Sequence, residues 1–469
     1  MQRFDRGSLW QVLSVDARLP QRRISGAVGT VPLASLADGS CLGGHLQTLR
    51  GRCVLLATGN QLTAALALIE LDGIAARIVL CPPDAPAAHL PAIAAAADVN
   101  AVVSDGIFDG VAALDIKPTV VASPNVTPST SRLAANRKTE WVLLTSGTTG
   151  EPKLVLYTRT ILAGAIKPAP PDAACPIWST FYDIRRYGGL QIFLRALLTG
   201  GSMVLSEAHE SVAAFLARAG ACGVTHISGT PSHWRRAIMS GAAQKMSPAY
   251  VRLSGEIADQ TVLDALARTY PDASVAHAFA STEAGVAFDV GDGRAGFPAY
   301  LIGASGTDVE MKIDGGSLRI RSPRTAIRYL GAAAAPLKDA DGFVDTGDIV
   351  ERHGDRYLFA GRRGGVINVG GAKVYPEEVE DVLNRHPAVE ASRAFARKSA
   401  FTGAIVAAEI VVRASSVAST AGPSGDAALQ ANILEFCRAA LPPHKVPAVL
   451  RLVPVIEVSP SGKLVRRHV

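Results

Sequence analysis

The chain has 469 residues, of which 48% are hydrophobic and 19% are charged. This composition excludes an intrinsically disordered protein and allows two or three domains with a large buried core. The formal charge of +6 does not predict nucleic-acid binding, because the basic residues are scattered and no aromatic-basic stripe accompanies them. Six cysteines without metal-ligand spacing predict buried thiols in a reducing compartment.

Apolar runs alternate with helical patterns in the first part of the chain. A run at 53–57 is followed by a helix-like stretch up to residue 72 and by a second run at 76–81. Another helix-like stretch at 90–97 precedes the apolar residues 101–103. This alternation predicts a doubly wound, parallel sheet.

The segment 117–138, rich in Pro, Ser, Thr and Asn, predicts a surface connection that leads to a distinctive stretch, VLLTSGTTGEPKLV, at 142–155. Its apolar residues predict the end of a buried strand, and its glycines let backbone N–H groups point at an anion. The lysine adds a positive charge for phosphate oxygens. The pattern differs from the loop GxxxxGK[ST], because no Ser or Thr follows the lysine. The predicted phosphate-binding residues are Thr145, Ser146, Gly147, Thr148, Thr149, Gly150 and Lys153.

This loop resembles the signature loop of the adenylate-forming superfamily, which includes acyl-CoA and aryl-CoA ligases, the adenylation domains of peptide synthetases, and luciferases. The resemblance extends over roughly residues 50 to 469. It implies an α/β fold with a large N-terminal domain, residues 1–361, of doubly wound mixed or parallel sheets with helices. A small mobile α+β C-terminal domain, residues 362–469, would follow a hinge near 362–365.

The segment AFASTE at 278–283 resembles the family's aromatic-Gly-x-Thr-Glu element. The resemblance implies that Phe279 packs on adenine, Thr282 contacts the α-phosphate and Glu283 helps hold Mg²⁺. Phenylalanine stands where tyrosine is commoner, and its ring still offers a face for stacking. Upstream, LSGE resembles the family's Ser-Gly-Gly/Glu turn. The further nucleotide contacts implied are Gly255, Glu256, Ala280, which stands where glycine is usual, and Ser281.

Two segments near the implied domain boundary resemble other family elements. The sequence VDTGD implies that Asp348 accepts hydrogen bonds from the ribose hydroxyls, as an acceptor-only carboxylate can. Residues 359–380 resemble the hinge and first strand pair of the small domain, in which Arg362 reaches the nucleotide near the ribose. Glycine stands at the hinge, where Asp or Lys is usual, and tolerates a wide range of backbone angles. The implied hinge and thiol-tunnel residues are Gly364, Gly370 and Gly371.

The C-terminal sequence SPSGK resembles the family's tail, which carries the lysine needed for adenylation. Lys463 is therefore the first candidate for catalysis, beside Lys153, Thr282 and Glu283. Joining a carboxylate to the α-phosphate of ATP brings two anions together. A mobile cation that bridges their oxygens lowers that barrier.

The acyl pocket is the least defined part of the site. By resemblance, FYDIRRYGGLQ at 181–191 lies where the ligases place an aromatic or histidine gate, and it contains no histidine. Tyrosine is the expected gate, and an arginine either meets a polar substrate tail or forms a structural salt bridge. The candidates are Tyr182, Arg185 or Arg186, Tyr187, Gly188, Ser254 and His226, the last expected as a packed structural histidine.

The resemblance implies a two-step ligase that uses ATP and Mg²⁺ to make an acyl-adenylate and then acylates coenzyme A. A simple carboxylic acid is favoured over an amino acid, because Asp183 does not reproduce the spacing of the aspartate that binds a substrate ammonium. Two alternatives stay open: loading of the phosphopantetheine arm of an acyl carrier protein, and a catalytically silent nucleotide-binding scaffold. The sequence shows no secretory signal and no apolar span of about twenty residues, which predicts a cytoplasmic location. The protein is expected to be a monomer or a homodimer.

Overall fold

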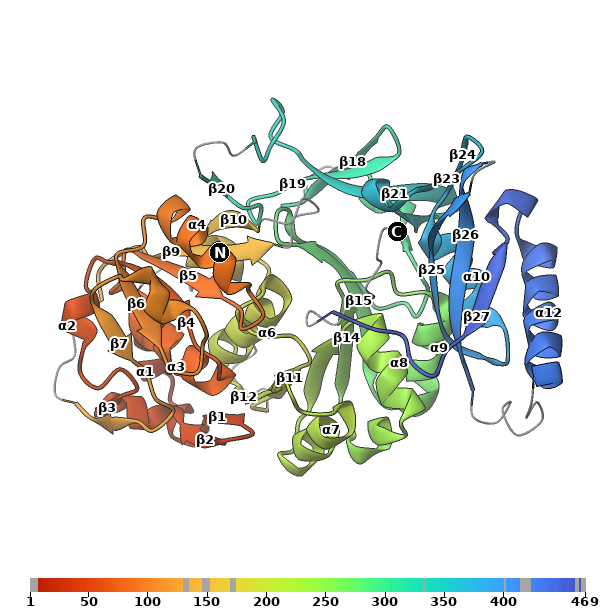
Figure 1. The fold of residues 1–469 in the computed structure, drawn as a ribbon. Coiled ribbons are helices and arrows are strands. Elements are labelled where there is room, and N and C mark those ends of the chain that lie inside the picture. The colour runs from red at the N-terminus through yellow and green to blue at the C-terminus, as the bar shows by residue number, and fades with distance from the viewer. Residues whose placement is uncertain are drawn as a thin grey trace.

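The computed structural model describes residues 7–129, 135–145, 152–168, 174–304, 306–331, 335–399, 402–413, 423–459 and 464. Two large sheets pack against each other through a layer of helices, and a smaller sheet with its own helices follows in the C-terminal part, blue in Figure 1. Within these residues no helix is long and apolar enough to cross a membrane.

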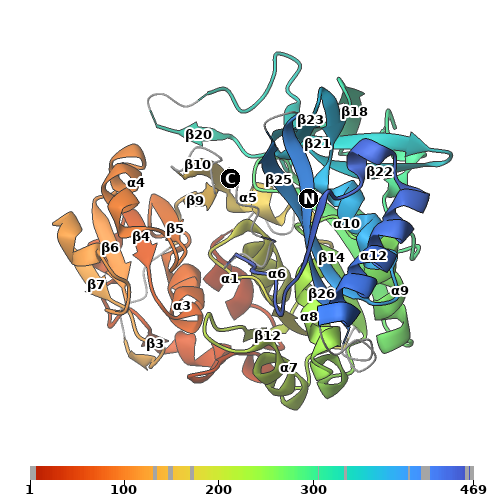
Figure 2. The same ribbon diagram turned by 45° about the vertical axis from the view of Figure 1, so that its right-hand side comes forward.

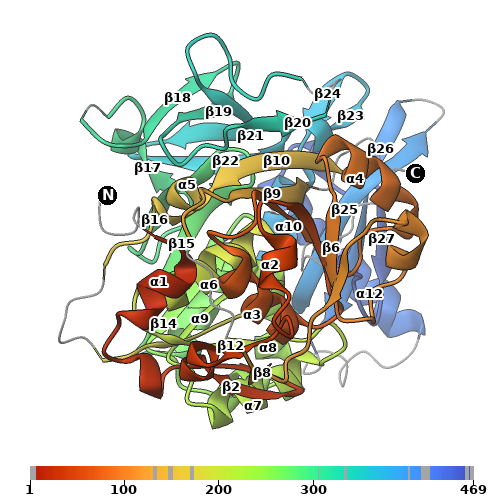
Figure 3. The same ribbon diagram turned by 90° about the vertical axis from the view of Figure 1, so that its left-hand side faces the viewer.

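A seven-stranded sheet comes mainly from the first third of the chain, orange in Figure 1. Its strands from β9 to β7 are parallel, whereas β10 and β20 join one edge in antiparallel pairs, side by side in Figure 3. Their nearly continuous apolar sequences fit burial on both faces. The order is β20 (Arg328–Leu330), β10 (Lys153–Thr158), β9 (Glu140–Thr145), β5 (Arg77–Cys81), β4 (Cys53–Ala57), β6 (Ala101–Ser104) and β7 (Thr119–Val121).

An eight-stranded sheet forms the second layer and is parallel except at its two edges. Its order is β16 (Gly285–Val290), β15 (Ser274–Ser281), β14 (Tyr250–Ser254), β13 (His226–Gly229), β11 (Ile177–Thr180), β12 (Ser202–Leu205), β1 (Arg23–Gly26) and β2 (Gly29–Pro32). One face packs on three helices: α7 (Val212–Ala221), α8 (Pro231–Met239) and α9 (Gln260–Thr269).

Two helices lie between these sheets, α3 (Gln61–Leu71) and α6 (Tyr187–Leu198), as Figure 2 shows. Every residue of α3 is buried, which fits its mainly apolar sequence, in which only Gln61, Thr63 and Glu70 are polar. One hydrophobic core joins Leu56 of β4 and Leu66 of α3 to Met203 of β12. The opposite face of the seven-stranded sheet is covered by α4 (Leu90–Ala96).

A five-stranded antiparallel sheet connects the large sheets to the C-terminal part. Its order is β17 (Phe297–Pro298), β22 (Arg356–Arg362), β21 (Val344–His353), β19 (Ser317–Arg321) and β18 (Glu310–Asp314). Phe288 of β16 and Phe297 of β17 share one core, with ring centroids 4.7 Å apart, so this sheet is fixed to the eight-stranded sheet.

The C-terminal sheet has a core of its own, in which Val379 and Leu383 pack on Val406 and Ile433. Its strands are β24 (Ala372–Val374), β23 (Ile367–Val369), β26 (Gly403–Val412), β25 (Val389–Ser399) and β27 (Val449–Leu452), and its helices are α10 (Pro376–Arg385) and α12 (Pro423–Ala440). The remaining short elements are α1 (Leu9–Ser14), α2 (Leu46–Leu49), α5 (Arg159–Ala163), β3 (Gly39–Ser40) and β8 (Thr127–Pro128).

The α/β fold class predicted from the sequence is confirmed, and the predicted strands at 53–57, 76–81 and 101–103 are all present. The segment 117–138 is not only a surface connection, because it contributes strand β7 beside β6. Val120 is buried there, so one apolar side chain within a polar segment was enough to add an edge strand. The proposed division of the chain near residue 362 stays a prediction.

Candidate active site

A cleft of about 1300 Å³ is lined by the ends of β9, β14 and β15 on one side and by β21, β22 and α10 on the other. It brings together most of the residues that the sequence singled out. These are Thr145, Lys153, Tyr182, Arg186, Tyr187, Gly188, Ser254, Gly255, Glu256, Phe279, Ala280, Ser281, Thr282, Glu283, Asp348 and Arg362. Ser146, Gly147, Thr148, Thr149, Gly150 and Lys463 lie outside the described residues.

The Thr282–Glu283 segment is held by two tyrosines from the neighbouring sheet. The Tyr157 hydroxyl donates to the carbonyl oxygen of Thr282 at 2.5 Å, and the Tyr329 hydroxyl donates to Glu283 Oε1 at 3.4 Å. The Lys153 ammonium lies 5.2 Å from the centre of the Tyr329 ring, within the range of a cation–π contact. Burial raises the pKa of both phenols, so both keep the proton that they donate.

The sequence reasoning missed both tyrosines, although β10 contains a signal for one of them. Side chains alternate between the faces of a strand, so Lys153 and Tyr157 point to the same face. The two faces are indeed distinct, because Val155 and Tyr157 belong to one hydrophobic core and Leu154 and Leu156 to another. No local signal identified Tyr329, which reaches this place through the pairing of β20 with β10.

We expect Tyr329→Phe to raise the Mg²⁺ concentration needed for half-maximal activity by a few-fold, about the value of one weak hydrogen bond. The variant keeps the ring beside Lys153 but loses the hydroxyl that orients the Glu283 carboxylate. Activity would be titrated with Mg²⁺ at saturating ATP. An unchanged Mg²⁺ requirement, with the same melting temperature, would show that Glu283 needs no such support.

Glu283 is the carboxylate that could hold a divalent cation here. Among the described residues, no group of three or more His, Cys, Asp or Glu side chains could form a metal site. Mg²⁺ does not need one, because it usually keeps several waters and binds one or two carboxylates together with substrate phosphates. A cleft-lining carboxylate that shares Tyr329 as a neighbour with Lys153 therefore fits a Mg²⁺–nucleotide complex and does not fit a tightly bound structural metal.

Phe279 presents its ring in a stack of aromatic side chains. Its centroid lies 5.3 Å from that of Phe359 at an interplanar angle of 8°, and 5.8 Å from that of Phe288 at 24°. Phe279 and Phe359 both line the cleft. The stack holds the Phe279 ring in one orientation, so that a planar base in the cleft would meet a fixed apolar surface.

Asp348 and Arg362 are direct partners on the antiparallel strands β21 and β22. The Arg362 Nε donates to Asp348 Oδ1 at 2.9 Å, and the Asp348 carboxylate raises the pKa of this guanidinium. Asp348 Oδ2 is buried and accepts no hydrogen bond from any described residue. A buried carboxylate oxygen without a donor suits a hydroxyl ligand, because an unmade hydrogen bond at such an atom is costly.

Tyr182 closes the part of the cleft expected to take the acyl group. Its hydroxyl donates to the carbonyl oxygen of Ser254 at 2.6 Å, and its ring packs on Gly188, where a Cβ would meet the ring at 3.4 Å. Tyr187 packs on Tyr157 with ring centroids 5.8 Å apart. The two predicted gate tyrosines are thus both at the cleft, and the hydroxyl of Tyr182 is already bonded.

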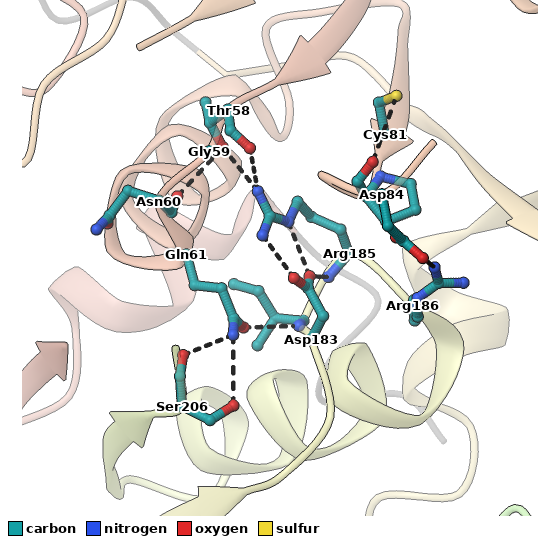
Figure 4. A network of polar contacts seen from close by, with 12 residues as sticks. Thr58, Gly59, Asn60, Gln61, Cys81, Asp84, Asp183, Arg185, Arg186 and Ser206 are labelled. Atoms are coloured by element: carbon teal, nitrogen blue, oxygen red, sulfur yellow. Dashed lines mark hydrogen bonds and ion pairs between the residues drawn. The ribbon is translucent and has the colours of Figure 1, made fainter. Parts of the chain in front are cut away.

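Arg185 does not line this cleft. Of the two roles that the sequence left open for it, the structural salt bridge is the one that its contacts fit. Its guanidinium is 1% exposed, pairs with Asp183 through Nε at 2.8 Å, and donates to the carbonyl oxygen of Thr58 (Figure 4). Beside it, Gln61 donates to the carbonyl oxygen of Ser206 at 2.7 Å. These bonds join residues that follow the ends of β4, β11 and β12, so Arg185 and Gln61 together tie the seven-stranded sheet to the eight-stranded sheet.

The other expected residues outside the cleft are His226, Gly364, Gly370 and Gly371. His226 packs on Trp178 with ring centroids 4.6 Å apart, and burial and the nearby Arg195 lower its pKa, which is what a packed structural histidine shows. The three glycines belong to the short segment after β22 and to the turn between β23 and β24. Their hinge and tunnel roles stay predictions.

These contacts, in a doubly wound fold with a separate C-terminal sheet, define the adenylate-forming class of proteins. The family model described as AMP-binding enzyme matches residues 39–330, and that of the AMP-binding enzyme C-terminal domain matches residues 378–463. The chain therefore belongs to the AMP-binding enzyme family, and the resemblance seen in its motifs is confirmed.

Known relatives are similar over most of the chain. The 2-succinylbenzoate–CoA ligase of Salmonella typhimurium is 26% identical over 347 residues, which cover 72% of this chain and 72% of that protein. CymA of Salinispora arenicola, a probable non-canonical nonribosomal peptide synthetase, is 27% identical over 388 residues. That match covers 74% of this chain but 5% of CymA.

Among solved structures, the anthranilate CoA ligase AuaEII in complex with anthranoyl-AMP matches with a TM-score of 0.78 at 16% identity. The match covers 97% of this chain and 95% of that one, and at this identity it shows the fold alone. By sequence and fold, the chain is similar to adenylate-forming acyl- and aryl-CoA ligases.

Proposed function

We propose that this protein activates a carboxylic acid with ATP to an acyl-adenylate, releases pyrophosphate, and then transfers the acyl group to coenzyme A. The observation that carries the proposal is the meeting of Lys153, Thr282, Glu283, Asp348 and Arg362 in one cleft. They come from four separate segments of the chain, and together they offer donors for phosphate and an acceptor for ribose. The names of the relatives point to the same chemistry.

In the first step, a carboxylate oxygen of the acid attacks the α-phosphorus of ATP. A new O–P bond forms, the bond to the bridging oxygen breaks, and pyrophosphate leaves with its electron pair. Mg²⁺ would screen the phosphate charges from Glu283, while Lys153 adds a positive charge on the same side. Asp348 Oδ2 would accept from a ribose hydroxyl, and Phe279 would support the base.

In the second step, the thiolate sulfur of coenzyme A attacks the acyl carbon, the C–O bond to AMP breaks, and AMP leaves. Gly370 and Gly371, the predicted thiol-tunnel residues, do not line the cleft. This step would therefore require the C-terminal sheet to turn. Added Cβ atoms at Gly364 and Gly365 would meet no described atom within 4 Å, which leaves the segment between β22 and β23 room to act as a hinge.

The substrate is proposed to be a simple carboxylic acid and not an amino acid. Asp183, the residue nearest to an ammonium-binding aspartate in the sequence, is occupied by Arg185. Burial alone would raise the pKa of Asp183, but the guanidinium outweighs it and lowers this pKa. An aspartate with its charge already paired has little to offer a substrate ammonium.

We expect Asp348→Asn to raise the Michaelis constant for ATP by about tenfold, the value of one charge-assisted hydrogen bond. The substitution replaces one acceptor oxygen of the carboxylate with a donor and leaves Arg362 beside a neutral side chain. Pyrophosphate release would be measured against ATP concentration. Asp345→Asn is the matched control, because Asp345 pairs with Arg363 and does not line the cleft. Equal effects of both variants would argue against the ribose assignment.

The proposed function is tested by carboxylate-dependent pyrophosphate release from Mg²⁺–ATP across fatty, aryl, dicarboxylic and amino acids, with and without coenzyme A. Turnover with one acid class and an acyl-CoA product would support the ligase. Adenylate formation without transfer to coenzyme A would favour a carrier protein as acceptor. ATP binding without any release would favour the silent scaffold.

A further inference from the structure

The carboxylate of Glu256 binds two backbone N–H groups from distant parts of the chain. Glu256 Oε2 accepts from the N–H of Ser232, near the start of α8, at 3.0 Å. Glu256 Oε1 accepts from the N–H of Leu464, in the C-terminal tail, also at 3.0 Å. Figure 1 shows the dark blue end of the chain leaving the C-terminal sheet and running back towards α8 and β14.

Glu256 is held in place by contacts that do not involve the tail. It follows Gly255, whose φ of +84° makes a tight turn after β14. The first N–H groups of a helix have no partner within the helix, and the positive end of the helix dipole favours a carboxylate. One oxygen of Glu256 is thus fixed on α8, and the other is aimed at the tail.

The tail also has a defined conformation at this point. Leu464 forms an antiparallel β-bridge with Val458, so its backbone position is fixed against a described residue of the same tail. Both Leu464 and Glu256 line the cleft. This bond therefore joins the last described residue of the C-terminal part to the body that carries the nucleotide residues.

A positive charge also lies near the Glu256 carboxylate. Arg236, one turn after Ser232 in α8, lines the same cleft. Within the part of the chain that the structure describes, its guanidinium makes no hydrogen bond or ion pair. Burial lowers the pKa of Arg236, and the Glu256 carboxylate opposes that shift. If Leu464 left, Glu256 would keep the Ser232 N–H and a nearby cation, so the tail can be released without stranding a charge.

We propose that Glu256 is a positioning residue, which anchors the tail at Leu464 for adenylate formation and releases it for thioester formation. The inference rests on the proposed function, because Leu464 directly follows Lys463, the lysine expected to assist adenylation. Fixing a backbone atom of the next residue limits where a side chain can reach. The anchor would not bind the nucleotide, so Glu256 has a different task from the nucleotide contact that its motif implied.

The test separates the two half-reactions in Glu256→Ala, which leaves no acceptor for the Leu464 N–H. The rate of adenylate formation would be measured as carboxylate-dependent exchange of pyrophosphate into ATP. This rate should fall by roughly tenfold to a hundredfold, as expected for losing a hydrogen bond to a charged group. The Michaelis constant for ATP should change less than about twofold, because the nucleotide contacts stay. Thioester formation from an added acyl-adenylate and coenzyme A should keep the wild-type rate.

The same bond can be removed from the other side. Leu464→Pro deletes the N–H donor and should reproduce Glu256→Ala, whereas Leu464→Ala keeps the donor and should retain at least about fivefold more adenylation activity than Leu464→Pro. The double variant Glu256→Ala/Leu464→Pro should be no slower than the slower single variant, because all three lack the same bond. Additive losses, or equal losses in both half-reactions, would overturn the anchor.

Amide hydrogen exchange tests the anchor even if the proposed function fails. In the wild-type protein, the Leu464 amide should exchange at least about tenfold more slowly than in Glu256→Ala, which offers no acceptor. Melting temperatures of both proteins would be compared to exclude unfolding. Equal exchange rates would overturn the anchor, and slow exchange in a protein without adenylation activity would reject the ligase while keeping the contact.

Discussion

Arg185→Met is expected to lower the free energy of unfolding by about 3–5 kcal/mol, the usual cost of removing one partner from a buried ion pair. Methionine fills much of the space of the 1%-exposed arginine, so packing is largely kept. What is lost is the charge that pairs with Asp183 and the donor to the carbonyl oxygen of Thr58. Urea unfolding at pH 7, followed by circular dichroism, would measure the change.

Arg186→Met is the matched control on the next residue. Arg186 pairs with Asp84, and their side chains are 22% and 32% exposed, so water screens the pair. Its loss should change the free energy of unfolding by less than about 1 kcal/mol. Similar losses in both variants would show that Arg185 does not carry the contact between the two sheets.

The stability deficit of Arg185→Met should also depend on pH, in a direction that the pKa of Asp183 decides. In the wild-type protein, the pKa of Asp183 is lowered, so this group stabilises the fold above its unfolded pKa and loses that contribution as the pH falls through the folded pKa. Without Arg185, burial would instead raise the pKa of Asp183. The unpaired carboxylate then destabilises the fold at neutral pH and becomes harmless when protonated. The deficit of Arg185→Met should therefore shrink between pH 7 and about pH 4.5.

Much of the fold could be predicted because it is written in short, local patterns. Strands β4, β5 and β6 are apolar runs bounded by polar residues and separated by helices, and they form where the alternation predicted. Edge strands such as β7 could not be found in this way. With a single buried side chain, Val120, such a strand depends on its neighbour more than on its own sequence.

In the site, too, local motifs could be predicted and contacts between distant residues could not. Lys153, Thr282 and Asp348 could be placed because each belongs to a motif whose residue types suit one ligand group. The contacts that orient them could not be placed, because they join residues far apart in sequence. Tyr329 reaches Glu283 only through strand pairing, and Arg185 reaches Thr58 only where two sheets meet. Hydrogen bonds of this kind leave no periodic trace in the sequence.

Lys463→Ala is expected to reduce adenylate formation by about a hundredfold to a thousandfold, the usual cost of removing one group that stabilises transition-state charge. The described residues place Leu464, the next residue, at the cleft beside Glu256. The proposal assigns the Lys463 ammonium to oxygens of the acid and the α-phosphate, where negative charge develops. The exchange of pyrophosphate into ATP would be measured with the best acid.

Arg466→Ala controls for the loss of one positive charge from the same tail, and it should change the exchange rate less than about threefold if the effect belongs to Lys463 and not to the net charge of the tail. Thioester formation, measured separately, decides whether Lys463 acts in adenylate formation alone. If Lys463 acts only while carboxylate and phosphate oxygens are joined, Lys463→Ala should still convert an added acyl-adenylate and coenzyme A to the thioester at the wild-type rate. Loss of both steps would mean that the lysine supports the fold or the binding of the adenylate. Loss of neither would remove it from the mechanism and leave Lys153 as the cation that assists adenylation.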